Sequence, residues 1–120
     1  MHGSAEIGEN GVVTVDVSRR EQILLQGILI KPDLNVMTSV QFEPLPDASH
    51  TAVGPDFSLL GREVNSVFMV MRAQGFHIDC LYNQETDEKP QLYFSHQINI
   101  GNAYVLAEAV RRGLDLTNSE

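Results

Sequence analysis

The spacing of apolar and polar residues divides the chain into seven regular segments. Strict alternation of the two kinds is typical of half-buried strands, and it predicts strands at residues 11–17, 36–43, 51–60, 76–84 and 91–98. Apolar residues at i, i+3, i+4 and i+7 are typical of helices instead. They predict one helix from Arg62 to Gly75 and a second that opens at Gly101-Asn102 and runs to Leu114. The predicted order is βββαββα.

Three shorter features qualify this pattern. Residues 22–35 are apolar but are interrupted by Gly27 and stopped by Pro32, so we predict a short turn of helix leading into extended chain. The strand at 51–60 is expected to bend or break at Gly54-Pro55, and Pro55, which has no N–H, is expected at an edge or a bulge. The polar residues 85–90 are predicted to form a hairpin loop.

Two helices that are apolar on one side need an apolar sheet face to cover them. We therefore predict an α+β fold, an antiparallel β-sheet with both helices packed on one face. A chain of 120 residues has the usual size of one domain. We assign that domain to residues 11–118, with residues 1–10 as a flexible N-terminal segment or a cloning remnant.

Composition and charge exclude several classes of function. No apolar run approaches the roughly 20 residues that a bilayer requires, and no secretory signal is present. We expect a cytoplasmic protein, or an exported mature domain whose leader was removed. The net charge of −8 and only two basic pairs make nucleic-acid binding unexpected. The single cysteine, Cys80, allows no internal disulfide and is expected to be buried. No cofactor is expected.

Candidate chemistry gathers on the hairpin of the strands at 76–84 and 91–98. Alternation places Tyr82 and Gln84 on one face of the first strand, and His96 beside Leu92 and Phe94 on the second. Because these apolar neighbours are expected to face the helices, the polar side chains are expected there too. A buried polar group needs a partner, so the sequence predicts internal partners or a ligand.

A resemblance to a bacterial family rests on motifs spread over residues 11–118. They include Arg20-Glu21-x-Ile23, Asp56-Phe57-x-Leu59, Glu63-Val64-Asn65-x-Val67, Asn83, Asp87-Glu88-x-Pro90-x-Leu92-x-Phe94-x-His96 and Leu114-Asp115-x-Thr117-Asn118. On these residues the chain resembles the second unit of the LppY/LpqO family, whose function is unknown. The resemblance implies a shape and a pocket rather than a reaction. It also implies relatives with two tandem units, many of them exported lipoproteins.

The same resemblance bears on metal binding. Family members carry a His-Asn-His group, then Glu-x-Pro and a downstream His. Here the first group is Tyr82-Asn83-Gln84, whereas Glu88 and His96 match. One imidazole and one carboxylate are too few for a tight transition-metal site, so we predict no metal.

Three functions follow as expectations. The first is a small-molecule pocket at the hairpin, with His96 and Glu88 as candidate acid-base residues and Tyr82, Asn83 and Gln84 as ligand-binding residues. The second is a non-catalytic interaction module that forms a homodimer. The third is a divergent metal-binding protein. Outside the hairpin, Glu63 is expected to cap a helix, and Arg19, Arg20 and Glu21 to form a surface ion cluster.

Overall fold

The computed structural model describes residues 3–31, 36–47, 49–83, 85 and 87–120. Its strands are β1 (Ser4–Ile7), β2 (Val13–Val17), β3 (Ile23–Leu25), β4 (Ile28–Ile30), β5 (Thr38–Pro44), β6 (Thr51–Leu60), β7 (His77–Ile78), β8 (Glu88–Lys89) and β9 (Leu92–Gly101). Its helices are the 3-10 turn η1 (Gly61–Glu63), α1 (Val64–Ala73) and α2 (Ala103–Leu114).

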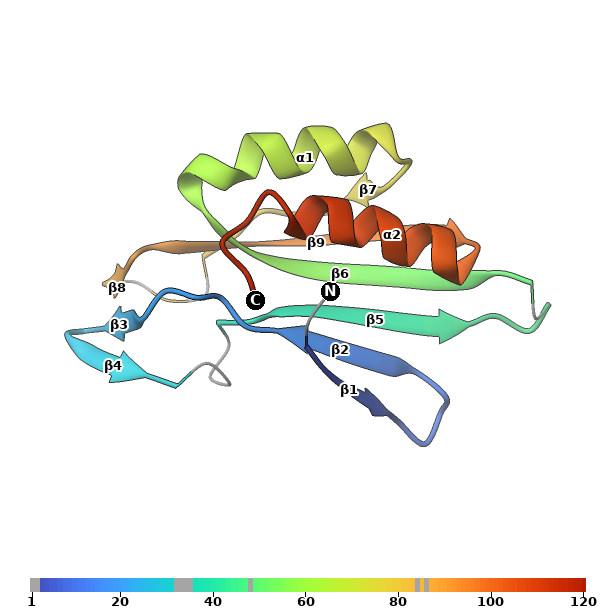
Figure 1. Cartoon of the computed structure of the whole chain (residues 1–120), viewed down its shortest axis with the longest axis horizontal. Helices are drawn as coiled ribbons and strands as arrows, with labels where there is room; N and C mark the ends of the chain where they lie inside the picture. The colour runs from blue at the N-terminus through green and yellow to red at the C-terminus, as the bar shows by residue number, and fades with distance from the viewer. Residues whose placement is uncertain (1–2, 32–35, 48, 84, 86) are drawn as a thin grey trace.

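One large antiparallel sheet organises the molecule. Six strands lie in the order β1-β2-β5-β6-β9-β7, and all of their pairings are antiparallel. Both helices lie over one face of this sheet (Figure 1). The predicted α+β fold with two helices on one face is therefore confirmed. We call the opposite side of the sheet the helix-free face.

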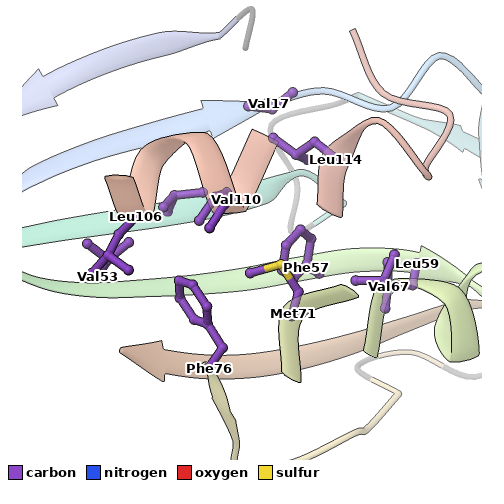
Figure 2. Close-up of a cluster of buried hydrophobic side chains, with 12 residues drawn as sticks. Val17, Val53, Phe57, Leu59, Val67, Met71, Phe76, Leu106, Val110 and Leu114 are labelled. Carbon is purple, nitrogen blue, oxygen red and sulfur yellow. The ribbon is translucent and has the colours of Figure 1, made fainter. Parts of the chain in front are cut away.

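The main core lies between the helices and the sheet. Alternate residues of β6, among them Val53, Phe57 and Leu59, point toward the helices. They meet Val67 and Met71 of α1, together with apolar residues of α2 (Figure 2). Burial of apolar side chains of this size stabilises the fold by roughly 1.5–3 kcal/mol each. The stripes predicted from helical spacing are the surfaces that pack here.

Local signals set the helix ends close to the predicted positions. α1 ends just before Gly75, which adopts φ = 88°, a conformation that glycine favours. α2 begins after Asn102, whose side-chain oxygen accepts hydrogen bonds from the amides of Tyr104 (3.0 Å) and Val105 (3.1 Å). Among the described residues, neither helix is long and apolar enough to cross a membrane.

A small second sheet corrects two predictions. Residues 23–30 form the β3–β4 hairpin instead of a turn of helix, because Gln26 (φ 51°) and Gly27 (φ 79°) make the two-residue turn that suits a hairpin. The expected Pro32 stop lies outside the described residues. The predicted loop at 85–90 contains β8, which pairs with β3. These strands lie at the opposite end of the molecule from the β1–β2 turn (Figure 1).

The second sheet also covers part of the helix-free face. Ile23 of β3 and Ile30 of β4 pack with Leu60, Leu92 and Phe94 of the large sheet. Apolar layers therefore cover parts of both faces of the large sheet. The part of the helix-free face beyond Phe94 is left open to solvent.

Two further features differ from the sequence prediction. Residues 4–7, inside the segment expected to be flexible, form the edge strand β1. Pro55 lies in the central strand β6 rather than at an edge, and β6 is continuous. The ladder from β6 to β5 is unbroken, whereas the ladder to β9 skips residues 54 and 55. The missing proline donor is accommodated at that interruption.

Candidate functional site

His96 projects from the helix-free face. Its cross-strand partner is Asp56 of β6, whereas the adjacent residue Ser95 is opposite Phe57 of the main core. Side chains alternate along a strand, so His96 and Asp56 both point away from the helices. The prediction that His96 shares a helix-facing side with Leu92 and Phe94 is half correct. The three do share a face, but it is the other one, where the second sheet covers the two apolar members.

A bulge brings Tyr82 onto this face. Ile78 pairs with Gln97, and Tyr82 bridges to Phe94, so three residues (79–81) lie opposite two on β9. One extra residue shifts the alternation by one position. The predicted strand at 76–84 is therefore regular only over His77–Ile78. The bulge also leaves Cys80 exposed, contrary to the prediction that it is buried.

Four polar side chains converge here, and we call them the Asp56 site: Asp56, Asp79, Tyr82 and His96. The Tyr82 hydroxyl donates to Oδ2 of Asp56 (3.2 Å). Nδ1 of His96 lies 3.4 Å from Oδ2 of Asp79, and Nε2 of His77 lies 3.1 Å from the other oxygen of Asp79. Tyr82 and His96 thus lie on one face, as the sequence predicted. The structure adds two carboxylates, Asp56 next to Tyr82 and Asp79 next to His96.

A hollow adjoins two of these groups, Asp56 and His96. It has a volume of about 140 Å³ and is lined by Ser39, Gln41, Gly54, Asp56 and His96. A second hollow of about 260 Å³ adjoins it and shares three of these residues, Gln41, Gly54 and His96. Gly54 keeps the floor open, because a Cβ atom placed there would lie 3.7 Å from Nε2 of His96.

Asp56 is the least satisfied group in the site. Its Oδ1 atom is buried and has no hydrogen-bond partner among the described residues. Burial raises the pKa of Asp56, although the Tyr82 hydroxyl and the charge of His96 act in the opposite direction. A buried acceptor without a donor is rare in native proteins, so Asp56 is the group of this site whose hydrogen bonding is incomplete.

The other predicted site residues lie elsewhere. Glu88 is buried in the second sheet and accepts hydrogen bonds from the amide of Leu92 (3.0 Å) and Nε2 of Gln91 (3.3 Å). Burial also raises the pKa of Glu88. Asn83 donates to the carbonyl of Leu92 (2.9 Å). Both residues organise the start of β9 and have no recorded contact with His96. Gln84 lies outside the described residues.

A second polar cluster has a buried centre, Arg19 and Glu63, which corrects the expected surface ion cluster. We call it the Arg19 network: Arg19, Glu21, Glu63 and Asn118. Arg19 bonds both oxygens of Glu21 (2.9 and 3.0 Å), Oε2 of Glu63 (3.0 Å) and the carbonyl of Ser58 (2.7 Å). Arg20, its neighbour, is exposed as expected.

Glu63 links this network to the helix that follows. It accepts the amide of Leu60 (2.7 Å), as expected for a capping residue, and the amide of Asn118 (3.0 Å). Every charge in the network has an opposite charge or a donor. The network joins the end of β2 to the C-terminal residues.

Sequence reasoning missed Asp56 and Asp79 as members of the site. A usable signal existed for Asp56. In β6, Ala52, Gly54, Asp56 and Ser58 alternate with the core residues, so a carboxylate was placed on the face opposite the helices. No signal gave Asp79, because its position depends on the bulge.

The side chains of this site do not form a set of metal ligands. Within the described parts of the chain, no three or more His, Cys, Asp or Glu side chains are grouped so as to hold a metal ion. The two carboxylates of the Asp56 site lie on opposite sides of His96 rather than converging on one point.

Fold and site together define an α+β domain with a polar, acidic hollow on the uncovered face of its sheet. A family model described as a Domain of Unknown Function (DUF1259) matches residues 2–116, and the chain belongs to that family. Comparison with curated proteins gave no match, and neither did comparison with solved structures.

Proposed function

We propose that this domain binds a small polar molecule in the hollow between Asp56 and His96. One observation carries the proposal: the buried Oδ1 atom of Asp56 has no donor, and its residue lines the hollow. Ser58 Oγ and Gln97 Oε1 are also buried without partners, but neither residue lines this hollow. A ligand that enters the hollow would complete the site by donating a hydrogen bond to the Asp56 carboxylate, after a rotation of the side chain that exposes Oδ1.

His96 is the candidate acid-base residue of the proposed site. An imidazole can both donate and accept a proton, and Asp56 is directly across the strand pair. Asp79, close to Nδ1 of His96, orients the ring so that Nε2 is directed toward Gly54 and the hollow. This resembles the general arrangement in which a carboxylate positions a histidine for proton transfer.

A thermal-shift screen tests the binding proposal. Purified protein would be melted with a library of metabolites and divalent metals, because a ligand that binds the folded state raises Tm. A true ligand should stabilise the wild type and His50→Ala but not His96→Ala. His50 is a matched control, since it is also exposed and paired with an aspartate, Asp47, but in a distant turn. Equal stabilisation of all three proteins would sink the proposal.

A second function, a non-catalytic module that forms a homodimer, is favoured by a different surface. Ile100, Tyr104 and Val105 at the β9–α2 junction are 56, 83 and 65% exposed, although all three are apolar or aromatic. Exposed apolar residues close together are common at protein contacts. Sedimentation at micromolar concentration would detect the dimer, and Tyr104→Ser should shift it to monomer. A monomeric wild type would eliminate this alternative.

Within the DUF1259 family, we propose that the chain is an LppY/LpqO-type domain. The motifs that run from Arg20-Glu21 to Thr117-Asn118 support this assignment. Two of them meet in space, because Glu63 and Asn118 both belong to the Arg19 network. The third expectation, metal binding, gains no support from the described residues and is not proposed.

A further inference from the structure

The β3–β4 hairpin presents apolar side chains to solvent. β4 is the outer strand of the small second sheet, and its residues Ile28 and Leu29 are 68 and 56% exposed. Leu24, which is opposite Leu29 on β3, is exposed as well. Exposed apolar residues that lie together often mark a surface that a partner or a ligand covers. The outer strand of the second sheet is therefore a candidate binding surface.

A hollow of about 490 Å³ lies along this strand, and we call it the β4 hollow. Its lining residues come from the end of β4, from the segment that precedes β3 and from the C-terminal residue: Leu29, Ile30, Lys31, residues 19–22 and Glu120. It is larger than either hollow at the Asp56 site and shares no lining residue with them. Its volume falls within the roughly 300–1,000 Å³ that is typical of small-molecule sites.

The charges that line the β4 hollow leave an excess of positive charge. Arg19 and Glu21 are already paired with each other in the Arg19 network. The other charged side chains are Arg20, Lys31 and Glu120, and none of them is in an ion pair within the described residues. Two positive charges against one negative charge favour an anion, although the whole chain has a net charge of −8.

The same hollow offers an apolar surface next to these cations. Leu29 and Ile30 supply branched aliphatic side chains, and the methylene stems of Arg20 and Lys31 add to them, because long basic side chains carry apolar stems below their charged heads. A ligand that matches both parts has an aliphatic tail and one anionic head. A carboxylate carries one negative charge and matches the excess of one positive charge, whereas a phosphate monoester carries about −1.5 to −2.

We propose that the β4 hollow binds a free aliphatic carboxylate. The carboxylate lies between Arg20 and Lys31, where a guanidinium can donate two parallel hydrogen bonds to it, and the alkyl tail lies along Leu29 and Ile30. A free molecule is favoured over an anionic lipid surface, because such a surface repels a chain of net charge −8. The inference goes beyond the function proposed above and uses no residue of the Asp56 site, so either site can fail without the other.

Titration calorimetry of the full chain with octanoate tests the role of the charges. Arg20→Gln/Lys31→Gln removes both exposed ionic contacts and should raise Kd about tenfold. Arg62→Gln/Arg72→Gln is the matched control, because it removes the same net charge from exposed positions at the two ends of α1. Its Kd should stay within about twofold of the wild type, since charges far from the ligand are largely screened.

A second pair of variants tests the apolar part of the hollow. Leu29→Gln should raise Kd at least about threefold, because the alkyl tail loses an apolar contact. Ile28→Gln is the matched control: Ile28 is the preceding residue of the same strand and is equally open to solvent, but it does not line the hollow. Its Kd should stay within about twofold of the wild type. Butyrate, which has a shorter tail, should bind at least about tenfold more weakly than octanoate.

Several outcomes overturn the assignment. Equal losses in the two charge variants, or equal affinity for octylamine and octanoate, would show that no anion is selected. Loss of octanoate binding in His96→Ala would place the ligand in the Asp56 site instead. Co-sedimentation with phosphatidylglycerol vesicles without binding of octanoate would identify a membrane contact and reject the free carboxylate. A wild type that binds no octanoate would reject the proposal and leave the Asp56 site untouched.

Discussion

The Arg19 network and the Asp56 site use similar chemical groups for different ends. Each combines two carboxylates with a basic side chain and a neutral hydrogen-bonding group. In the Arg19 network the basic group is 1% exposed and all of the charged groups are paired. In the Asp56 site the His96 side chain is 46% exposed, its contact to Asp79 is long, and one oxygen of Asp56 has no partner.

The difference teaches how to separate structural charge from functional charge. The paired charges of the Arg19 network fix the C-terminal residues to β2 and to the start of the first helix. In the Asp56 site the pairing is incomplete and a hollow lies beside it, so these charges contribute less to the stability of the fold and remain available to a ligand. Residue type alone does not distinguish the two regions, because the sequence contains acidic and basic groups at both. The distinction comes from what surrounds them.

The largest expected effect is the loss of Arg19. Arg19→Met leaves the buried Glu63 and the partly buried Glu21 without their main partner, so we expect a loss of about 3–5 kcal/mol in the free energy of unfolding. Urea denaturation measures it. Arg20→Met is the matched control, since Arg20 is exposed, and it should change stability by less than about 0.5 kcal/mol. A loss below about 1 kcal/mol for Arg19→Met would show that the Arg19 network does not hold the fold together.

Acid sensitivity should trace largely to Glu21. Its burial would raise the pKa, but hydrogen bonds from Arg19 and Asn118 outweigh that effect and lower the pKa of Glu21 to about 2 from an ordinary 4.5. A carboxyl whose folded pKa is depressed contributes stability that is present above 4.5 and lost as the pH falls toward 2. By linkage this amounts to about 3 kcal/mol.

Denaturant titrations across that pH range measure the contribution. The wild type should lose about 3 kcal/mol more than Glu21→Gln between the two ends of the range, because the variant has no carboxyl to titrate. The variant itself should be less stable than the wild type at neutral pH. Parallel pH profiles for the two proteins would contradict the assignment of the acid sensitivity to Glu21.

Asp56 should show the opposite sign. Because burial raises the pKa of Asp56, the folded protein holds this proton more tightly than the unfolded chain does. The proton therefore favours folding below pH 3.8, and this contribution to stability is lost as the pH rises through the raised pKa. Asp56→Asn removes the charge and should stabilise the free protein by about 1 kcal/mol near neutral pH while it weakens ligand binding. The same titrations measure it. A variant that is less stable than the wild type at neutral pH would place Asp56 with the structural charges.

The helices and the main core follow directly from the sequence, because their signals are local. The stripe of Val64, Val67 and Met71 and the Asn102 cap depend only on residues within a few positions of each other. The β3–β4 hairpin was missed because Ile23 to Ile30 is a short apolar run, which periodicity cannot assign to helix or strand. Its turn at Gln26-Gly27 was the overlooked local signal.

The site was only partly predictable, since it depends on long-range pairing. Alternation placed Tyr82 and His96 on one face, which is correct, but it assigned both side chains to the helix-facing side of the sheet, which is wrong. The face of β9 was misassigned because apolar Leu92 and Phe94 were taken as proof of the helix side, whereas a second sheet covers them. The position of Tyr82 then depended on a one-residue bulge at 79–81 that has no clear sequence marker.

The smallest effect on stability is expected at His96, and it decides whether the two regions differ in kind. The side chain is nearly half exposed and its 3.4 Å contact to Asp79 is weak, so His96→Ala should change the free energy of unfolding by less than about 0.5 kcal/mol without ligand. The same substitution should remove the stabilisation that a ligand gives, about 2.7 kcal/mol at one hundred times Kd. Denaturation with and without a ligand found in the thermal-shift screen, beside His50→Ala, measures both quantities. If His96 is a functional residue, its removal changes the stability of the free protein little and abolishes the stabilisation by the ligand. A loss above about 1.5 kcal/mol without ligand would instead make His96 a structural residue like Arg19. Removing a side chain destabilises the free protein that much only if it makes strong interactions in the folded state.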